Sequence, residues 1–191
     1  ESAHILVGNA LRLDWNEVVP ASEHVYVMGN PPFIGQYTKT AEQTADMKAV
    51  WGADYDGYLD YVTGWHAQAM HYFANQPVGR FAFVTTNSIA QGQPVPALFG
   101  PLRREGWMIP FAHRTFAWTS EAPGAAGVHC VIVGFSKGIP LKGARLFYYE
   151  RSQGQPVEEP VTAINPYLVE GPWVLVGKRS KPLAQLPAVL Y

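Results

Sequence analysis

The segment His24-Val25-Tyr26-Val27-Met28-Gly29-Asn30-Pro31-Pro32-Phe33 decides the fold class of this 191-residue chain. Its first five residues are mostly β-branched or aromatic and predict a buried strand that ends at Gly29. A second apolar run over residues 80–86 also leads into polar residues, Asn87 and Ser88. Polar groups at the carboxyl ends of strands are typical of open α/β sheets, which bind ligands at that edge. We therefore expect an α/β fold with a ligand site directly after Gly29.

The rest of the chain predicts strands that first alternate with helices and then follow one another. Residues 5–7 predict an earlier strand, and apolar positions at steps of four and three from Asp54 to about Asn75 predict an amphipathic helix. The acidic residues Asp54, Asp56 and Asp60 suit the first part of that helix. A shorter helix and three strand-like runs are expected at residues 97–104, 108–113, 128–135 and 145–149.

This order of elements predicts a mainly parallel sheet that closes with an antiparallel hairpin. After Glu150, a stretch rich in Gln and Gly predicts a linker. We expect residues 1–150 to form the main structural unit, and residues 151–191 to be a linker and the start of a following region. Hydrophobic residues make up 48% of the chain and charged residues only 15%. Some of the apolar surface is therefore expected to face other parts of a longer protein.

The tetrapeptide Asn30-Pro31-Pro32-Phe33 carries the predicted chemistry. Two consecutive prolines fix the backbone and remove two amide donors, which leaves carbonyls that only accept hydrogen bonds. The side-chain oxygen of Asn30 and the carbonyl of Pro31 form an acceptor pair that suits a planar amino group. Such a pair would hold the amine hydrogens while the nitrogen faces an electrophile. Phe33 offers an aromatic face on which a heterocycle can stack.

Several blocks of the sequence resemble one known family. The pattern Asn-Pro-Pro-aromatic after a strand is similar to the signature of amino-group methyltransferases with the class I, Rossmann-like fold. The blocks at residues 8–15, 29–35, 86–92, 111–118 and 164–168 resemble the MmeI-like family. Members of this family are bacterial restriction-modification enzymes that combine nuclease, methyltransferase and target-recognition parts. The resemblance implies the C-terminal portion of a methyltransferase sheet, and it implies methylation of the N6 amine of adenine in DNA by S-adenosylmethionine.

The resemblance also implies roles for individual residues in catalysis. Asn30-Pro31-Pro32-Phe33 would form the catalytic segment, in which Asn30 and the Pro31 carbonyl bind the amine of an adenine flipped out of double-stranded DNA. Phe33 would stack on one face of that base, and Phe116 or Trp118 would cover the other face, with Phe116 preferred. Direct transfer of a methyl group to nitrogen requires no metal.

The cofactor contacts that the resemblance implies are Asn9, Ala10 and Leu11. The glycine-rich cofactor loop of the family, and the acidic residue that holds the cofactor ribose, are expected upstream of residue 1. The chain would then keep the pocket for the target amine and depend on the remaining domains of the longer protein for the rest of the cofactor site. We therefore expect the isolated chain to be inactive.

The composition disfavours several other classes of function. The net charge is −1, with three basic and nine acidic residues before residue 76 and 11 basic and six acidic residues after it, so the second part suits phosphate contacts better. Cys130 is the only cysteine, which excludes an intrachain disulfide, and its apolar surroundings predict burial. His66 and His71 lie five residues apart and share no helix face, which disfavours a zinc site. No apolar stretch is long enough to span a membrane, and we expect a cytoplasmic protein.

Two other functions stay open on the sequence alone. Protein methyltransferases that modify a glutamine side-chain amide also use Asn-Pro-Pro-aromatic, although the blocks at residues 86–92 and 111–118 favour a DNA enzyme. Alternatively, the chain acts only as a structural or interaction module of its parent enzyme, because the expected cofactor loop is missing from it.

Overall fold

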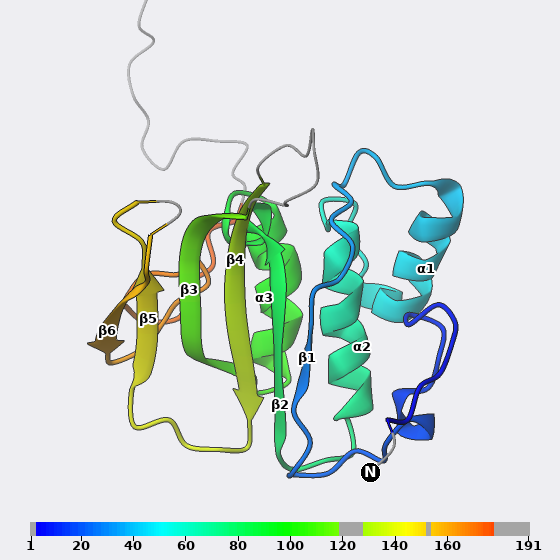
Figure 1. Cartoon of the computed structure of the whole chain (residues 1–191). Helices are drawn as coiled ribbons and strands as arrows, with labels where there is room; N and C mark the ends of the chain where they lie inside the picture. Colours follow the sequence, from blue (N-terminus) through cyan, green and yellow to red (C-terminus); the bar gives the residue numbers. More distant parts are fainter. Residues whose placement is uncertain (1–2, 119–127, 152–153, 178–191) are drawn as a thin grey trace, which may run out of the picture.

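The computed structural model describes residues 3–118, 128–151 and 154–177, which fold around one six-stranded sheet in the order β1-β2-β4-β3-β5-β6 (Figure 1). Helix α3 lies behind the sheet in this view, α2 lies beside β1, and α1 lies beside α2. The helices are α1 Ala41–Trp51, α2 Gly64–Tyr72 and α3 Pro94–Arg104. The strands are β1 Val27–Gly29, β2 Gly79–Thr86, β3 Met108–Trp118, β4 Val128–Lys137, β5 Ala144–Tyr148 and β6 Val157–Val161.

The sheet is mixed, so the prediction of a mainly parallel sheet is wrong for the strand pairings. The pairs β1–β2 and β3–β5 are parallel, whereas β2–β4, β3–β4 and β5–β6 are antiparallel. The reason is that β4 lies between β2 and β3 and runs against both. The predicted antiparallel hairpin was not assigned to particular strands; in the structure the consecutive strands β3 and β4 pair antiparallel, and so do β5 and β6. Because β1, β2, β3 and β5 point the same way, their carboxyl ends lie at one edge of the sheet.

The strand expected at residues 5–7 is absent, so that prediction is wrong. Ile5 and Val7 are 75% and 95% exposed. β1 stands at the end of the strand order and pairs with β2 alone. An apolar tripeptide forms a strand only when a neighbouring strand accepts its backbone hydrogen bonds, and no described strand does so here. Further along, Trp15–Glu17 form a single 3-10 turn capped by the Asp14 side chain.

The helical region differs from the prediction in two ways. Helix α1 was not expected, although it begins with a capping box. The Thr40 hydroxyl accepts a hydrogen bond from the Gln43 backbone N–H, and the Gln43 side-chain oxygen accepts one from the Thr40 backbone N–H. The predicted helix from 54 to 75 is continuous only over α2. Before it, Tyr61 donates its backbone N–H to Ile34 at 2.9 Å, which is incompatible with a continuous helix. None of the described helices has the length and hydropathy needed to cross a membrane.

The core lies between the sheet and the helices α2 and α3. His66 of α2 is fully buried there, with its ring edge-on to the rings of Phe81, Phe83 and Phe135 at centroid distances of 5.2 to 5.9 Å. Cys130 is fully buried, as predicted, and burial raises the pKa of its thiol. The helices and the sheet therefore form a tightly packed body that holds the strand ends in place.

The chain continues to pack on the same core beyond residue 150. β6 pairs with β5 from Tyr148↔Val157 to Ala144↔Val161. Val161, Ile164 and Leu168 then join the core, with exposed fractions of 7% or less. The division into residues 1–150 and 151–191 stays a prediction, but at least one strand of the sheet lies after this boundary.

Candidate functional site

The segment Asn30-Pro31-Pro32-Phe33 lies where β1 ends, at the shared carboxyl edge of the sheet. Asn30 and Pro32 are exposed, Pro31 is buried, and Phe33 is half-buried against the core. β2 runs parallel to β1, so the segment after Thr86 emerges at the same edge. The arrangement leaves the Asn30 amide free to face a ligand, while Pro31 anchors the segment to the body of the protein.

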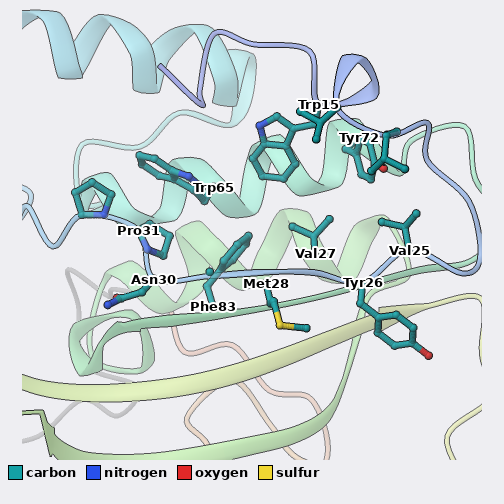
Figure 2. A pocket seen from close by; sticks show the side chains of 14 residues that line it. Trp15, Val25, Tyr26, Val27, Met28, Asn30, Pro31, Trp65, Tyr72 and Phe83 are labelled. Atoms are coloured by element: carbon teal, nitrogen blue, oxygen red, sulfur yellow. The ribbon is translucent and has the colours of Figure 1, made fainter. Parts of the chain in front are cut away.

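An apolar pocket of about 590 Å³ runs along β1 and reaches Asn30, Pro31 and Pro32 at one end (Figure 2). Figure 2 shows Val25 and Val27 pointing into the space below α2, whereas Tyr26 and Met28 point the opposite way. The other walls come from Trp15, Trp65, Tyr72 and Phe83.

The polar groups of two of these aromatic side chains already form hydrogen bonds within the protein. Trp15 donates from Nε1 to the Ala10 carbonyl at 2.9 Å, and the Tyr72 hydroxyl donates to the Val19 carbonyl at 2.8 Å. Because these polar groups are already occupied, the pocket offers mainly apolar ring surface, which suits an apolar or flat group next to the Asn30 amide.

Asp60 connects the segment after Phe33 to the end of β2. Its Oδ1 accepts a hydrogen bond from the Gln36 backbone N–H at 2.7 Å, and its Oδ2 accepts from the Ser88 hydroxyl at 2.5 Å and from the Thr86 hydroxyl at 3.3 Å. Asp60 is only 7% exposed. One buried carboxylate therefore sets the position of two segments that form the carboxyl edge.

The sequence did not single out Asp60 for this role. Asp60 was grouped with Asp54 and Asp56 as the acidic start of a helix. It does precede the 3-10 turn Tyr61–Thr63 that leads into α2, but its side chain makes no capping hydrogen bond there. Asp54 forms an ion pair with Arg104, and Asp56 accepts a hydrogen bond from the Tyr58 backbone N–H. The available signal was local, because Asp60 is the only charged residue in the otherwise apolar run Tyr58-Leu59-Asp60-Tyr61-Val62.

The substitution Asp60→Asn should destabilise the fold by about 2 kcal/mol. An amide has the same shape as the carboxylate, but it turns an N–H group toward one of the donors that Asp60 now accepts from, which leaves buried donors unsatisfied. Urea unfolding measures the loss. Asp54→Asn is the matched control, since a surface ion pair contributes about 1 kcal/mol or less. Equal stability of the two variants would contradict the role of Asp60.

Asn9, Ala10 and Leu11, the expected cofactor residues, lie in a turn that is bound tightly to the protein. The Asn9 amide donates to Asp46 at 2.8 Å and accepts from the Leu11 backbone N–H at 3.0 Å. The Leu11 side chain is buried, and an added Cβ on Gly64 would come within 2.9 Å of it. In the structure these residues make hydrogen bonds and packing contacts within the protein. Their contact with a cofactor stays a prediction.

Asp46 is the centre of the interactions around this turn. Burial alone would raise the pKa of the Asp46 carboxyl, but hydrogen bonds from Arg12, Asn9 and Tyr61 outweigh it and bring the pKa below its usual range. Arg12 binds Asp46 at 2.7 Å, and the Tyr61 hydroxyl donates to it at 3.3 Å. Since Tyr61 directly follows Asp60, these two consecutive residues connect the Asn9 turn with the segments after β1 and β2.

The aromatic residues expected to cover the second face of a base lie at the end of β3. Phe116 is 9% exposed and Trp118 is 41% exposed, with ring centroids 6.2 Å apart. Tyr149, which the sequence did not indicate, lies 5.1 Å from Phe116 and shares a hydrogen bond of 2.9 Å with His113. β2 and β4 separate β3 from β1, a distance of about 14 Å at ordinary strand spacing. Phe33 and Phe116 therefore share an edge without touching.

Comparison with known proteins agrees with this arrangement. Residues 1–148 match the family model described as MmeI, DNA-methyltransferase domain. The chain is 38% identical over 186 residues to DNA methyltransferase A of Bacillus subtilis (strain 168), and this match covers 96% of the chain and 20% of that protein. It superposes on the structure of the Type IIL restriction-modification enzyme MmeI in complex with DNA with a TM-score of 0.90 and 43% identity, over 96% of the chain and 25% of MmeI.

These matches place the chain among DNA-methyltransferase domains. Within that class it belongs to the MmeI family. The chain spans about a fifth to a quarter of the length of these two relatives. A modification subunit of a putative type I restriction enzyme from Vibrio vulnificus shares the fold at 12% identity, with a TM-score of 0.51.

Proposed function

We propose that the longer protein containing this chain transfers a methyl group from S-adenosylmethionine to the N6 amine of adenine in double-stranded DNA, as part of a restriction-modification enzyme. The observation that supports this most directly is the exposed Asn30 amide at the carboxyl edge, held in place by buried Pro31 beside an apolar pocket. Family membership supports the methyl transfer, and the acceptor pair formed by the Asn30 side-chain oxygen and the Pro31 carbonyl supports an amino group as the target. DNA as the substrate is in turn consistent with a cytoplasmic enzyme.

In this proposal the protein contributes orientation and hydrogen bonds. The oxygen of Asn30 and the carbonyl of Pro31 accept the two amine hydrogens, which turns the nitrogen lone pair toward the methyl donor. The amine proton that is lost on transfer passes to solvent or to a neighbouring acceptor. When bound, S-adenosylmethionine would supply an electrophilic methyl group; its bond from sulfur to the methyl carbon would break and the neutral thioether S-adenosylhomocysteine would leave, so neither a covalent enzyme intermediate nor a metal is needed.

The pocket along β1 fits part of this cofactor. Its aromatic walls, among them Trp65, suit a sulfonium cation, which is attracted to ring faces. No carboxylate lines the pocket in the described part of the chain, whereas ribose hydroxyls are commonly bound by an acidic residue. We therefore propose that the remaining domains of the longer protein supply the ribose contact, with Asn9, Ala10 and Leu11 forming one side of the adenosine site.

The target adenine must leave the duplex to reach Asn30, because its amine is paired inside the helix. Phe33 would then stack on one face of the base. Phe116 remains our preferred residue for the other face, although Trp118 is the more exposed of the two. Since β3 lies apart from β1, the base would have to lie across the strand ends between them.

The substitution Phe33→Ala should weaken binding of the extruded base about tenfold in the longer protein, because base stacking contributes about 1–3 kcal/mol per base. Fluorescence of 2-aminopurine at the target position reports the unstacked base and measures the effect. Phe33→Tyr keeps the ring and serves as the control. If both variants gave the wild-type fluorescence change, Phe33 would not be the stacking residue.

Two measurements separate the proposed function from the two alternatives. The longer protein is incubated with labelled S-adenosylmethionine and either adenine-containing duplex DNA or a release-factor peptide with the glutamine acceptor. Label in DNA supports the proposal, and label in the peptide supports a glutamine methyltransferase. Calorimetric titration of the 191-residue chain with S-adenosylmethionine tests the non-catalytic alternative, because saturable binding by the chain alone would exclude a purely structural role.

A further inference from the structure

A second pocket, of about 390 Å³, adjoins the segment that follows Phe33. Its lining comes from that segment, from the turn before α2 and from the segment after β2. Gln36 lies three residues after Phe33, so their Cα atoms are at most about 10 Å apart. The pocket therefore begins within reach of a base held at Asn30. The residues that characterise it are Gln36, Tyr37, Tyr58, Ser88, Gln91 and Gln93.

The walls of this pocket are fixed by hydrogen bonds made outside it. Asp60 binds both the Gln36 backbone and the Ser88 hydroxyl, and Asp56 binds the Tyr58 backbone at 2.8 Å. The walls are therefore already ordered before a ligand binds, which lowers the entropic cost of binding.

The side chains around the pocket are neutral, and they combine rings with amides. Tyr37 is 86% exposed and Tyr58 is 36% exposed, so both rings are accessible to a ligand in the pocket. The Gln36 side-chain oxygen is buried and has no hydrogen-bond partner among the described residues. Among the residues that the structure describes, no charged residue lines the pocket, so it is unsuited to a phosphate group. Tyrosine rings stack on nucleobases, and glutamine amides and serine hydroxyls bind base edges.

We propose that this pocket holds the base of the nucleotide next to the methylated adenine. The proposal rests on the proposed function, since it takes the position of the target base from Asn30. In it, Tyr37 stacks on the neighbouring base, and the Gln36 and Gln91 amides bind its edge. The pocket would keep the strand in place after the target base has left the stack.

The test uses the longer protein and a duplex that carries the methylation site mapped from the enzyme's own product DNA. Its dissociation constant is measured for the wild type, for Tyr37→Ala and for Tyr37→Phe. Both changes lie at an exposed side chain, so the fold is retained. We expect Tyr37→Ala to raise the dissociation constant about tenfold, and Tyr37→Phe, which keeps the ring, to stay near the wild type.

A second arm assigns the effect to the base. Duplexes with an abasic site on either side of the target adenine are compared, and one of them should weaken wild-type binding and remove the difference between wild type and Tyr37→Ala. Gln91→Ala should also weaken binding to the intact duplex, whereas Gln76→Ala, on the segment between α2 and β2 at the opposite edge, should not.

Two results would overturn the inference. One is an unchanged dissociation constant in Tyr37→Ala and Gln91→Ala, and the other is a full difference between wild type and Tyr37→Ala on both abasic duplexes. If the wild type methylates no DNA, the proposed function itself has failed, which is a distinguishable result.

Discussion

Replacing Asn30 by alanine in the longer protein should reduce methyl transfer to DNA by about 100-fold or more while the fold stays intact. The amide supplies one of the two acceptors that align the target amine, and loss of alignment at a reacting atom costs rates of this order. Asn30 is exposed, so its removal creates no cavity. Single-turnover kinetics measure the methylation rate, and thermal unfolding checks the fold.

Asn75→Ala is the matched control for this substitution. Asn75 is also exposed, but it follows α2 near the opposite edge of the sheet. This variant should methylate DNA at the wild-type rate. An Asn30→Ala enzyme that retained most of its single-turnover rate would show that the amide does not bind the target amine.

Acid should destabilise the domain steeply because of His66. Its full burial among aromatic rings lowers the pKa of the imidazole from 6.5 to about 3. The nearby backbone of Val62 opposes this only slightly, because neither ring nitrogen forms a full hydrogen bond to a described residue. Between pH 6.5 and 3 the unfolded chain binds a proton that the folded protein excludes. The free energy of unfolding therefore falls as the pH falls through this window, by about 1.4 kcal/mol per pH unit.

The substitution His66→Leu should remove this pH dependence. Between pH 7 and pH 4.5, His66 alone accounts for a loss of about 2.5 kcal/mol, and leucine fills a similar volume without a titrating group. Urea unfolding at the two pH values measures the difference for each variant. His71→Leu, on the same helix but exposed, should keep the wild-type pH dependence. The same loss of stability in His66→Leu as in wild type would contradict the assignment.

Elements with strong local signals could be predicted from the sequence. β2 and α3 lie close to the predicted residues, because a continuous apolar run and Pro near a helix start are local features. The capping box at Thr40 is equally local and could have predicted α1. β6 was missed because Val157-Glu158-Glu159-Pro160-Val161 has no apolar alternation, and its pairing with β5 depends on tertiary structure. The absence of a strand at residues 5–7 follows from the lack of a pairing partner, which no local pattern reveals.

The candidate site divides in the same way. Asn30 and Phe33 were found because a rigid Asn-Pro-Pro segment after a strand is visible in the sequence. Asp60 and Tyr149 were not, since their importance comes from contacts with residues 24 to 36 positions away. The role of Asn9 also depends on a distant partner, Asp46. Local sequence therefore located the reactive edge, whereas the residues that position it became apparent only in the folded structure.

The position of the methyl group in the DNA product shows whether Asn30 binds an exocyclic adenine amine. Duplex DNA is treated with the longer protein and S-adenosylmethionine, digested to nucleosides and analysed by mass spectrometry. We expect N6-methyladenine as the product of the wild type and its near absence in Asn30→Ala. Methylation of a cytosine ring carbon would contradict this expectation, because an acceptor pair that holds an exocyclic amine has no part in that reaction.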